Sequence, residues 1–197
     1  MQPQTFIFMG RSGEGKGTQA TEIMELLKKK DPTRGIIYIQ TGQELRQFIK
    51  GQSFTEKVTK KMYDEGGLMP EFIAIYVWVK ALVERYTGNE HFIFDGIARR
   101  VEEAKILGQV FGFYGLSKPW VIEIDVGTDE ATRRLLARKR FDDNEAEIRR
   151  RLAWYDTEVR PSVEYFSTSP LFNFVRIEGE HTIKEIHEDI VKKVGLE

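Results

Sequence analysis

The sequence predicts an α/β fold in which helices cover both faces of a mostly parallel, five-stranded sheet. Three observations support this fold class. Short apolar runs alternate with segments of helical periodicity, the runs are far enough apart for crossover connections, and a glycine-rich loop links the first run to the first helical segment. The expected strands are Thr5–Met9, Ile36–Gln40 and the runs at 91–94, 120–126 and 174–177.

The glycine-rich loop is the most informative segment of the chain. Residues 10–19 read Gly-Arg-Ser-Gly-Glu-Gly-Lys-Gly-Thr-Gln and lie between an apolar run and a helical pattern, which is the context of a phosphate-binding loop. Glycines let successive backbone N–H groups converge on one anion, the helix start adds its positive end, and Lys16 adds a full charge. The common pattern has a hydroxyl directly after the lysine, whereas here Gly17 intervenes and the hydroxyl arrives at Thr18. The strand and helix on either side argue against a simple glycine-rich turn with a stray lysine.

The middle of the chain predicts a small helical lobe followed by a core helix. Residues 43–65 are polar and helix-prone, which favours a lobe outside the main core. After Pro70, apolar residues recur at helical spacing from Ile73 to Leu82.

The last third predicts two further helices. From Asp143 onward, apolar residues keep to one helical face as far as Phe166, with a kink expected at Pro161. Thr182 and Glu185 predict a capping box at the start of a C-terminal helix. Since no internal repeat or linker interrupts the pattern, we expect one domain over residues 1–197.

Composition excludes several classes of protein. The chain has 197 residues, of which 41% are hydrophobic and 31% charged, so we expect a soluble globular protein with a real core. It has no Cys, which excludes disulfides, thiolate metal sites and a cysteine nucleophile. No apolar run is long enough to cross a bilayer, and the net charge of −1 does not indicate nucleic acid as a partner. A cytoplasmic location follows as the default expectation.

Acidic and basic residues beyond the loop predict a second part of the site. Asp95 ends an apolar run beside the expected phosphate loop, where it can organise Mg²⁺ through water; the alternative is that it caps the next turn. Arg134 and Arg138 stand four residues apart on one helix face. More arginines follow at 140, 149, 150 and 151. Such a run is often a solvated helix face, but positioned guanidinium groups also neutralise a phosphoryl group in transfer.

Several motifs, in order along nearly the whole chain, resemble the adenylate kinases among the nucleoside monophosphate kinases. Gly-Lys-Gly-Thr-Gln at 15–19 resembles their ATP-phosphate loop, and Thr-Gly-Gln-Glu-Leu-Arg at 41–46 resembles their monophosphate-binding segment. Gly-Gly-Leu-Met-Pro at 66–70 resembles the turn that closes that site, and Asp-Gly-Ile-Ala-Arg at 95–99 resembles Asp-Gly-Phe-Pro-Arg. Arg-Phe-Asp-Asp at 140–143 and Arg-Leu at 151–152 resemble the catalytic region.

The resemblance implies a role for each matched residue. Lys16 and Thr18, within the loop that contains Gly13, Gly15 and Gly17, would hold the ATP phosphates, and Asp95 the Mg²⁺ shell. Residues 41–70 would form the monophosphate-binding lobe of a P-loop fold. The monophosphate side would be built by Thr41, Arg46, Gly96, Arg99 and Glu103. Arg134 would lie against the ATP adenine, while Lys16, Arg99, Arg138, Arg140 and Arg151 would neutralise the transferring phosphoryl group.

Four departures from the family's pattern affect these expectations. Only Lys139 separates Arg138 from Arg140, where the family has a lid, so we expect no lid domain, weaker ATP binding and some transfer to water. A second subunit is an alternative cover; otherwise we expect a monomer. Glu14 brings a charge into the phosphate loop, which must point away from the nucleotide or weaken its binding, and Ala98 replaces a proline, which would loosen the placement of Arg99.

Glu103 is the departure that affects base specificity. The family's adenylate kinases have Gln there, which both accepts from and donates to adenine, whereas an ionised Glu only accepts and suits guanine. The alternative is that Glu103 turns to solvent. The sequence therefore predicts a kinase that uses MgATP to phosphorylate AMP, with GMP or a pyrimidine monophosphate as the alternative acceptor. A nucleotide-binding regulatory protein with little turnover is the competing hypothesis from another class.

Overall fold

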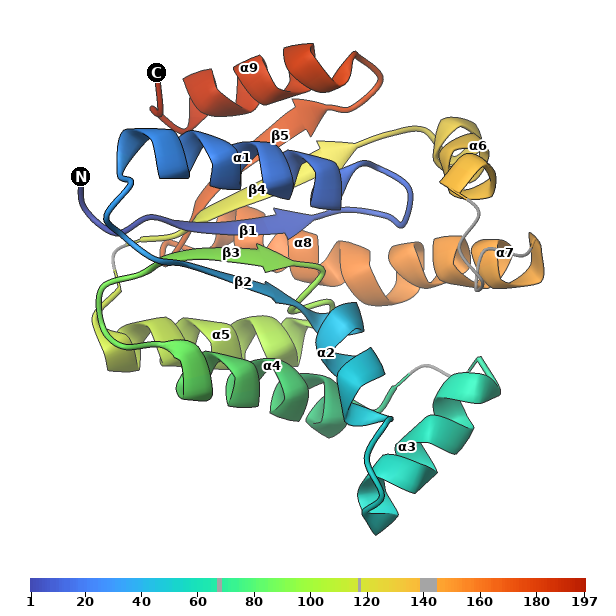
Figure 1. Cartoon of the computed structure of the whole chain (residues 1–197). Helices are drawn as coiled ribbons and strands as arrows, with labels where there is room; N and C mark the ends of the chain where they lie inside the picture. Colours follow the sequence, from blue (N-terminus) through green and yellow to red (C-terminus); the bar gives the residue numbers. More distant parts are fainter. Residues whose placement is uncertain (67–68, 117, 139–144) are drawn as a thin grey trace.

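The sheet is built as the sequence predicts, from five parallel strands. The computed structural model describes residues 1–66, 69–116, 118–138 and 145–197. Within these, the strands are β1 (Thr5–Met9), β2 (Ile36–Gln40), β3 (His91–Asp95), β4 (Trp120–Asp125) and β5 (Asn173–Glu178), in the order β2-β3-β1-β4-β5 (Figure 1). The expected strand bounds differ from these by one residue at most, because β-branched and aromatic runs end where the turn residues begin.

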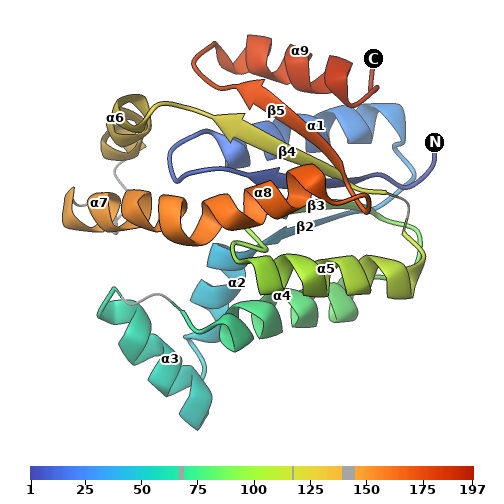
Figure 2. The same cartoon turned by 180° about the vertical axis from the view of Figure 1, so that it is seen from behind.

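Helices cover both faces of this sheet, which confirms the expected layers. Helices α1 (Lys16–Lys30) and α9 (Ile183–Lys193) pack on one face, and α4 (Glu71–Arg85), α5 (Val101–Tyr114) and α8 (Arg160–Thr168) pack on the other (Figures 1 and 2). Side chains of β1 alternate between the two apolar clusters, since successive residues of a strand point to opposite faces: Phe6 and Phe8 join the α1 side, and Ile7 and Met9 the α4 side. All five residues of β1 are buried, which fixes the loop that follows it.

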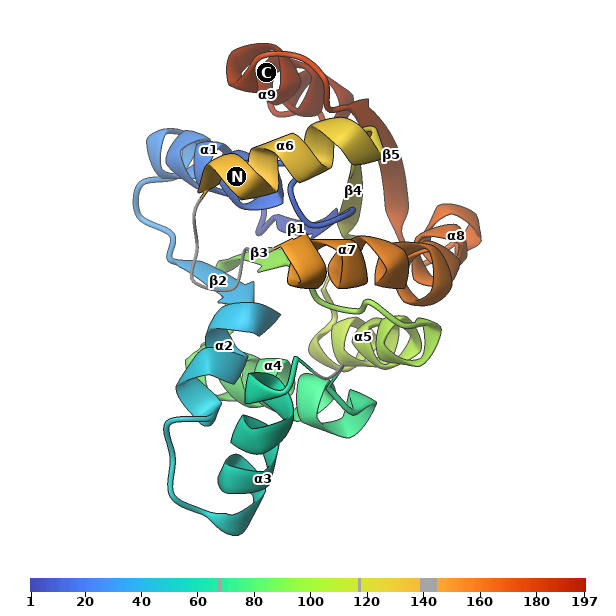
Figure 3. The same cartoon turned by 90° about the vertical axis from the view of Figure 1, so that its right-hand side faces the viewer.

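Two helices extend beyond the carboxyl ends of the strands. Helix α2 (Thr41–Phe48) starts directly where β2 ends, and α3 (Phe54–Asp64) projects away from the sheet (Figures 1 and 3). The predicted helical character of 43–65 is therefore confirmed, with a break at 49–53. Ser53 and Glu56 form a capping box that restarts the chain as α3.

The long helix predicted up to Phe166 is not continuous. Helix α6 (Thr128–Arg138) is followed by α7 (Glu145–Trp154), a π-helical turn η1 (Tyr155–Val159) and then α8. The backbone N–H of Arg160 donates to the carbonyl of Tyr155, five residues back, and Pro161 lies in the first turn of α8. Because proline has no N–H to continue the ladder, the predicted kink takes the form of a π turn just before it. The expected start at Asp143 lies outside the described residues.

The C-terminal helix begins as predicted. Glu185 N–H donates to the Thr182 hydroxyl at 3.2 Å, and Thr182 N–H donates to the Glu185 carboxylate at 2.9 Å, which completes the expected capping box. Across the described ranges, no helix combines the length and the apolar character that crossing a bilayer requires.

Candidate active site

A large pocket of about 1270 Å³ opens at the carboxyl ends of β1, β2 and β3, the edge at which α/β sheets bind ligands. Its walls come from the glycine loop, α2, α3, the loop after β3, α6, α7 and η1, and the start of α9. Nearly all of the predicted site residues line it: Gly13, Gly15, Lys16, Gly17, Thr18, Thr41, Arg46, Asp95, Gly96, Arg99, Glu103, Arg134 and Arg151. Arg140 and the side chain of Arg138 lie outside the described residues.

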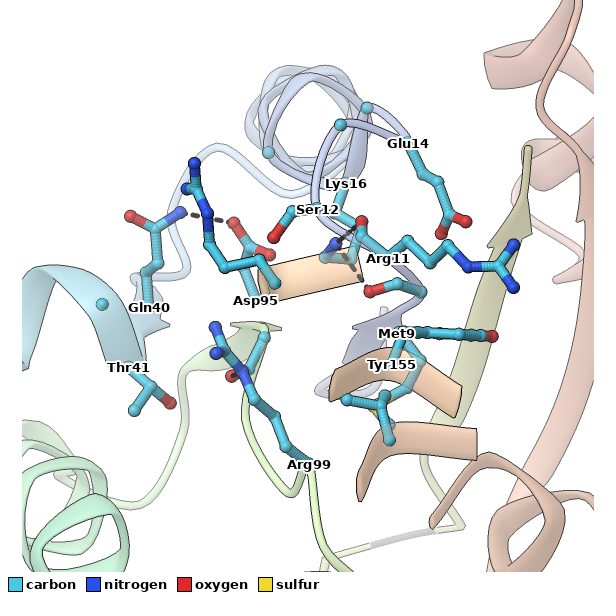
Figure 4. A pocket seen from close by; sticks show the side chains of 18 of the residues that line it. Met9, Arg11, Ser12, Glu14, Lys16, Gln40, Thr41, Asp95, Arg99 and Tyr155 are labelled. Carbon is cyan, nitrogen blue, oxygen red and sulfur yellow. Dashed lines mark hydrogen bonds between the residues drawn. The ribbon is translucent and has the colours of Figure 1, made fainter. Parts of the chain in front are cut away.

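The glycine loop has the backbone of an anion-binding turn. Gly15, with φ 91°, is the N-cap of α1 and provides no side-chain cap, so the first N–H groups of the helix face the pocket mouth without a capping side chain. Gly13 has φ 95°, and a Cβ there would lie 2.5 Å from the carbonyl oxygen of Ala131. Lys16 reaches back over the loop, where its Nζ donates to the carbonyls of Gly10 at 2.8 Å and Arg11 at 2.5 Å (Figure 4).

Glu14 points away from the Asp95 side of this loop, which agrees with one of the two outcomes that the sequence left open (Figure 4). Its carboxylate is only 1% exposed and packs against Gly10, where a Cβ would lie 2.1 Å from Oε2. Burial raises the pKa of Glu14 to about 7, although Lys16 and Arg11 favour the charged form. The Glu14 carboxyl is therefore buried against the loop. Because its pKa is near 7, this carboxyl gains a proton near neutral pH.

Asp95 lies opposite Lys16 at the end of β3. It is 5% exposed and accepts hydrogen bonds from the hydroxyl of Tyr38 at 3.0 Å and the amide of Gln40 at 2.5 Å (Figure 4). Gly17 comes close to it, since a Cβ there would lie 3.4 Å from Asp95 Oδ2. One oriented carboxylate beside a phosphate loop fits Mg²⁺, which takes few protein ligands and completes its shell with phosphates and water.

The other end of the pocket gathers the residues expected to hold the monophosphate. Thr41 is 8% exposed, and its hydroxyl has no hydrogen-bond partner among the described residues. Arg46 folds over Gly42, where a Cβ would meet its Nη1 at 3.2 Å. Arg99 donates from Nε to the carbonyl of Gly96 at 3.0 Å, and Figure 4 shows it reaching up into the pocket toward Asp95.

Glu103 faces this end of the pocket from the first turn of α5. It is 3% exposed, so the alternative in which Glu103 turns to solvent is wrong. Burial raises the pKa of its carboxyl, while Arg99 and Arg100 lower it. A carboxyl in such a place can hold its proton and act as a donor as well as an acceptor.

Helix α6 supplies the wall near the start of α9. Arg134 donates to Glu130 at 2.6 Å and to the carbonyl of Gly179 at 2.9 Å, so two hydrogen bonds hold its guanidinium group at the pocket wall. Hydrogen bonds from Arg133 and Arg134 lower the pKa of Glu130 to about 2.

The structure also places two arginines that the sequence did not single out. Arg11 lies 4.4 Å from the ring centre of Tyr155 and pairs with Asp156 at 3.2 Å. Arg100 pairs with Glu158 at 2.7 Å and donates to the carbonyl of Met69 at 3.3 Å. Tyr155, Asp156 and Glu158 all lie on η1. This turn therefore contacts both the glycine loop, through Arg11, and the loop after β3, through Arg100. Only adjacency to the glycine loop and to Arg99 pointed to these arginines in the sequence.

Ala98, the residue that replaces a proline, is held by a contact of its own. It is fully buried with φ 51°, and its carbonyl accepts a hydrogen bond from the hydroxyl of Ser162 at 2.6 Å. A buried contact therefore holds this backbone where the family has a proline, and the effect of Ala98 on the placement of Arg99 stays a prediction.

Comparison with known proteins agrees with this geometry. The family model described as adenylate kinase matches residues 8–170. A protein of Leptospira biflexa named adenylate kinase is 34% identical over 192 residues, which covers 95% of this chain and 98% of that relative. Adenylate kinases of Bacteroides fragilis (31%, covering 95% and 96%) and Corynebacterium diphtheriae (32%, covering 96% and 98%) are similar over the same extent. The chain belongs to the adenylate kinase family of enzymes.

Proposed function

We propose that this chain transfers the γ-phosphoryl group of MgATP to AMP and so forms two molecules of ADP, reversibly. One observation carries the proposal: the glycine loop with Lys16 and the group of Thr41, Arg46 and Arg99 line the same pocket. A donor and an acceptor can therefore meet without leaving it. The names of the relatives, all adenylate kinases, support AMP as the acceptor.

On the donor side, the N–H groups at the start of α1 and the Lys16 ammonium would take the ATP phosphates. Lys16 now donates to two loop carbonyls, and these bonds hold it over the place where the phosphates would bind. Gly13, Gly15 and Gly17 let the backbone approach, and Thr18 adds a hydroxyl. Arg134 would stack on the adenine with the planar face that its bonds to Glu130 and Gly179 orient.

On the acceptor side, Arg46 and Arg99 would bind the monophosphate, with Gly96 at the turn and Thr41 near the base. We assign residues 41–70 as the lobe that holds this nucleotide. Asp95 would hold Mg²⁺ through water, and the ion would neutralise phosphate charge when bound.

Positioning and charge neutralisation are the whole mechanism. A phosphate oxygen of AMP attacks the γ-phosphorus, the bond to the β-phosphate oxygen breaks, and no side chain serves as a nucleophile. Negative charge spreads over the oxygens of the transferring group, and Lys16, Arg99 and Arg151 surround it, together with the predicted Arg138 and Arg140.

The experiment compares ADP formation from MgATP and AMP by the wild type and by Lys16→Ala. We expect kcat/KM to fall by at least about 100-fold in the variant. Lys28→Ala, an exposed lysine on the same helix that pairs with Glu25, serves as the matched control and should keep wild-type activity. Equal ADP from wild type and Lys16→Ala would favour the regulatory nucleotide-binding protein instead.

GMP is the second candidate acceptor, and buried Glu103 is the observation that favours it. When ionised, Glu103 can accept from the adjacent N–H donors of guanine; when neutral, it can donate to N1 of adenine as Gln would. Because burial raises its pKa, we expect AMP to be preferred at low pH and the preference for AMP over GMP to shrink as pH rises. Parallel assays with AMP, GMP, CMP and UMP across pH, on wild type and Glu103→Gln, test this expectation. A strong, pH-independent preference for AMP in both proteins would exclude GMP as the acceptor.

We further propose a cytoplasmic enzyme that acts as a monomer. The absence of Cys from the whole sequence supports the location. Light scattering at working concentration measures the second point directly.

A further inference from the structure

The loop between Asp95 and Arg99 contains two residues in the left-handed backbone conformation, Gly96 and Ala98. Gly96 has φ 64°, which glycine adopts freely, but Ala98 has φ 51°, which an L side chain adopts only at a cost. Ala98 is the only non-glycine residue with positive φ among those described. Such a backbone persists only where its surroundings hold it, and Arg99 follows it directly.

Ser162 provides the contact that holds this turn. Its hydroxyl donates to the Ala98 carbonyl at 2.6 Å, both residues are 0% exposed, and 64 positions of sequence separate them. Without this donor, the described structure would leave a buried carbonyl oxygen unsatisfied at the strained residue. Ser162 comes directly after Pro161 in the first turn of α8, so the π turn and the proline fix where its hydroxyl lies.

A second bond ties the same loop to the same stretch of chain. Arg100 Nε donates to Glu158 on η1 at 2.7 Å. Contacts from 158 and 162 thus bracket Arg99 on both sides, at Ala98 and at Arg100. The side chain of Arg99 is then directed by its bond from Nε to the Gly96 carbonyl, at 3.0 Å, on the inner side of the turn.

We propose that Ser162 is a positioning residue for the acceptor site: through the Ala98 carbonyl it holds the turn that points Arg99 at the phosphate of the monophosphate nucleotide. This rests on the proposed function, in which Arg99 binds that phosphate. Ser162 does not line the pocket and acts only through the loop. The structure therefore predicts that losing its hydroxyl weakens the acceptor nucleotide while sparing ATP.

The test measures AMP and ATP dissociation constants separately by calorimetry, which needs no turnover. For Ser162→Ala we expect the Kd for AMP to rise about tenfold, and the Kd for ATP to stay within about twofold. Ser167→Ala is the matched control, because Ser167 on the same helix also donates to a carbonyl, that of Glu164 at 2.9 Å, but is exposed and remote from the loop. It should change neither constant.

Two further variants separate the loop's geometry from simple loss of packing. Adding Ala98→Gly to Ser162→Ala removes the steric cost of the left-handed turn, so AMP affinity should recover to within about threefold of wild type. Ser162→Cys keeps a side chain of similar shape but is a weak donor, so its Kd for AMP should rise by less than that of Ser162→Ala. If the alanine variant does not fold, the comparison of Ser162→Cys with wild type is the test.

The proposal is overturned if Ser162→Ala or Ser162→Cys leaves AMP binding unchanged, if it weakens ATP and AMP equally, or if Ala98→Gly gives no recovery. Failure of the proposed function would look different. In that case the wild type itself would bind no AMP, or would bind it without forming ADP.

Discussion

At the scale of single residues, the feature with the largest consequence is the carboxylate of Glu14 inside the phosphate loop. Glu14 occupies a position next to Lys16 where an anion would repel the phosphates. The chain accommodates it by burying the carboxylate against Gly10, away from the pocket centre. The consequence is a group that titrates near the pH at which enzymes work.

Replacing Glu14 should reveal this titration as a change in stability. Because the pKa of Glu14 is raised from 4.5 to about 7, the folded state holds this proton more tightly than the unfolded state. The contribution of Glu14 to the free energy of unfolding is therefore greatest below about pH 4.5 and falls as the pH rises to about 7. Glu14→Gln removes this loss and should gain up to about 3 kcal/mol over wild type near pH 8, but little near pH 4. Chemical denaturation across pH measures the difference between the two proteins.

Glu22→Gln, which removes a carboxyl at an exposed position on α1, is the control for the loss of one negative charge. The same titration predicts that ATP binding by the wild type weakens as pH rises through 7, whereas Glu14→Gln binds ATP equally across that range. A constant difference in stability between wild type and Glu14→Gln from pH 4 to 8 would contradict the raised pKa.

At the scale of elements, the sequence predicted what local patterns determine. All five strands, the helix that begins at the Thr182 capping box and the helical character of 43–65 follow from apolar periodicity, turn residues and caps within a few positions of one another. Most of the site was predictable because the motifs follow the strand ends in order.

What the sequence could not show are contacts between distant segments. The bond from Ser162 to Ala98 spans 64 positions, and that from Arg100 to Glu158 spans 58. The π turn was anticipated only as a kink, because Pro161 breaks the ladder without specifying which carbonyl finds a new partner. Tyr155 fitted the apolar helix face, yet it lies under the Arg11 guanidinium.

The packing of α6 on the glycine loop gives an element-scale prediction. At Gly13 a Cβ would lie 2.5 Å from the Ala131 carbonyl and 2.9 Å from Leu135, on top of a φ of 95°. Gly13→Ala must therefore push α6 away, and we expect a loss of at least about 2 kcal/mol in the free energy of unfolding, with weaker ATP binding.

Gly15→Ala is the matched comparison. Its φ of 91° is as strained, but nothing lies within 4 Å of the added Cβ, so its loss should be near 1 kcal/mol, the strain alone. Urea unfolding of the two variants separates packing from backbone strain. Equal losses would show that α6 does not press on Gly13.

For the whole molecule, the sequence expectation still to be tested is that no lid domain covers the ATP phosphates. Helix α6 ends at Arg138 and α7 begins at Glu145, so six residues, 139–144, join them. The relatives align with this chain over 95% or more of both lengths, which leaves no room in them for a large domain that this chain lacks. A site without a lid domain admits water to the γ-phosphate.

We therefore predict that the wild type hydrolyses ATP when no acceptor nucleotide is present. Release of inorganic phosphate should be measurable, at roughly a hundredth of the rate of transfer to AMP or more, since water then competes at the open site. Adding AMP should suppress the release, because the acceptor occupies the place from which water attacks. Lys16→Ala should abolish it, which shows that hydrolysis and transfer use the same pocket. Undetectable phosphate release beside brisk ADP formation would contradict this prediction and mean that the site is covered. A solution mass above that of the 22.9 kDa chain would then indicate a second subunit as the cover.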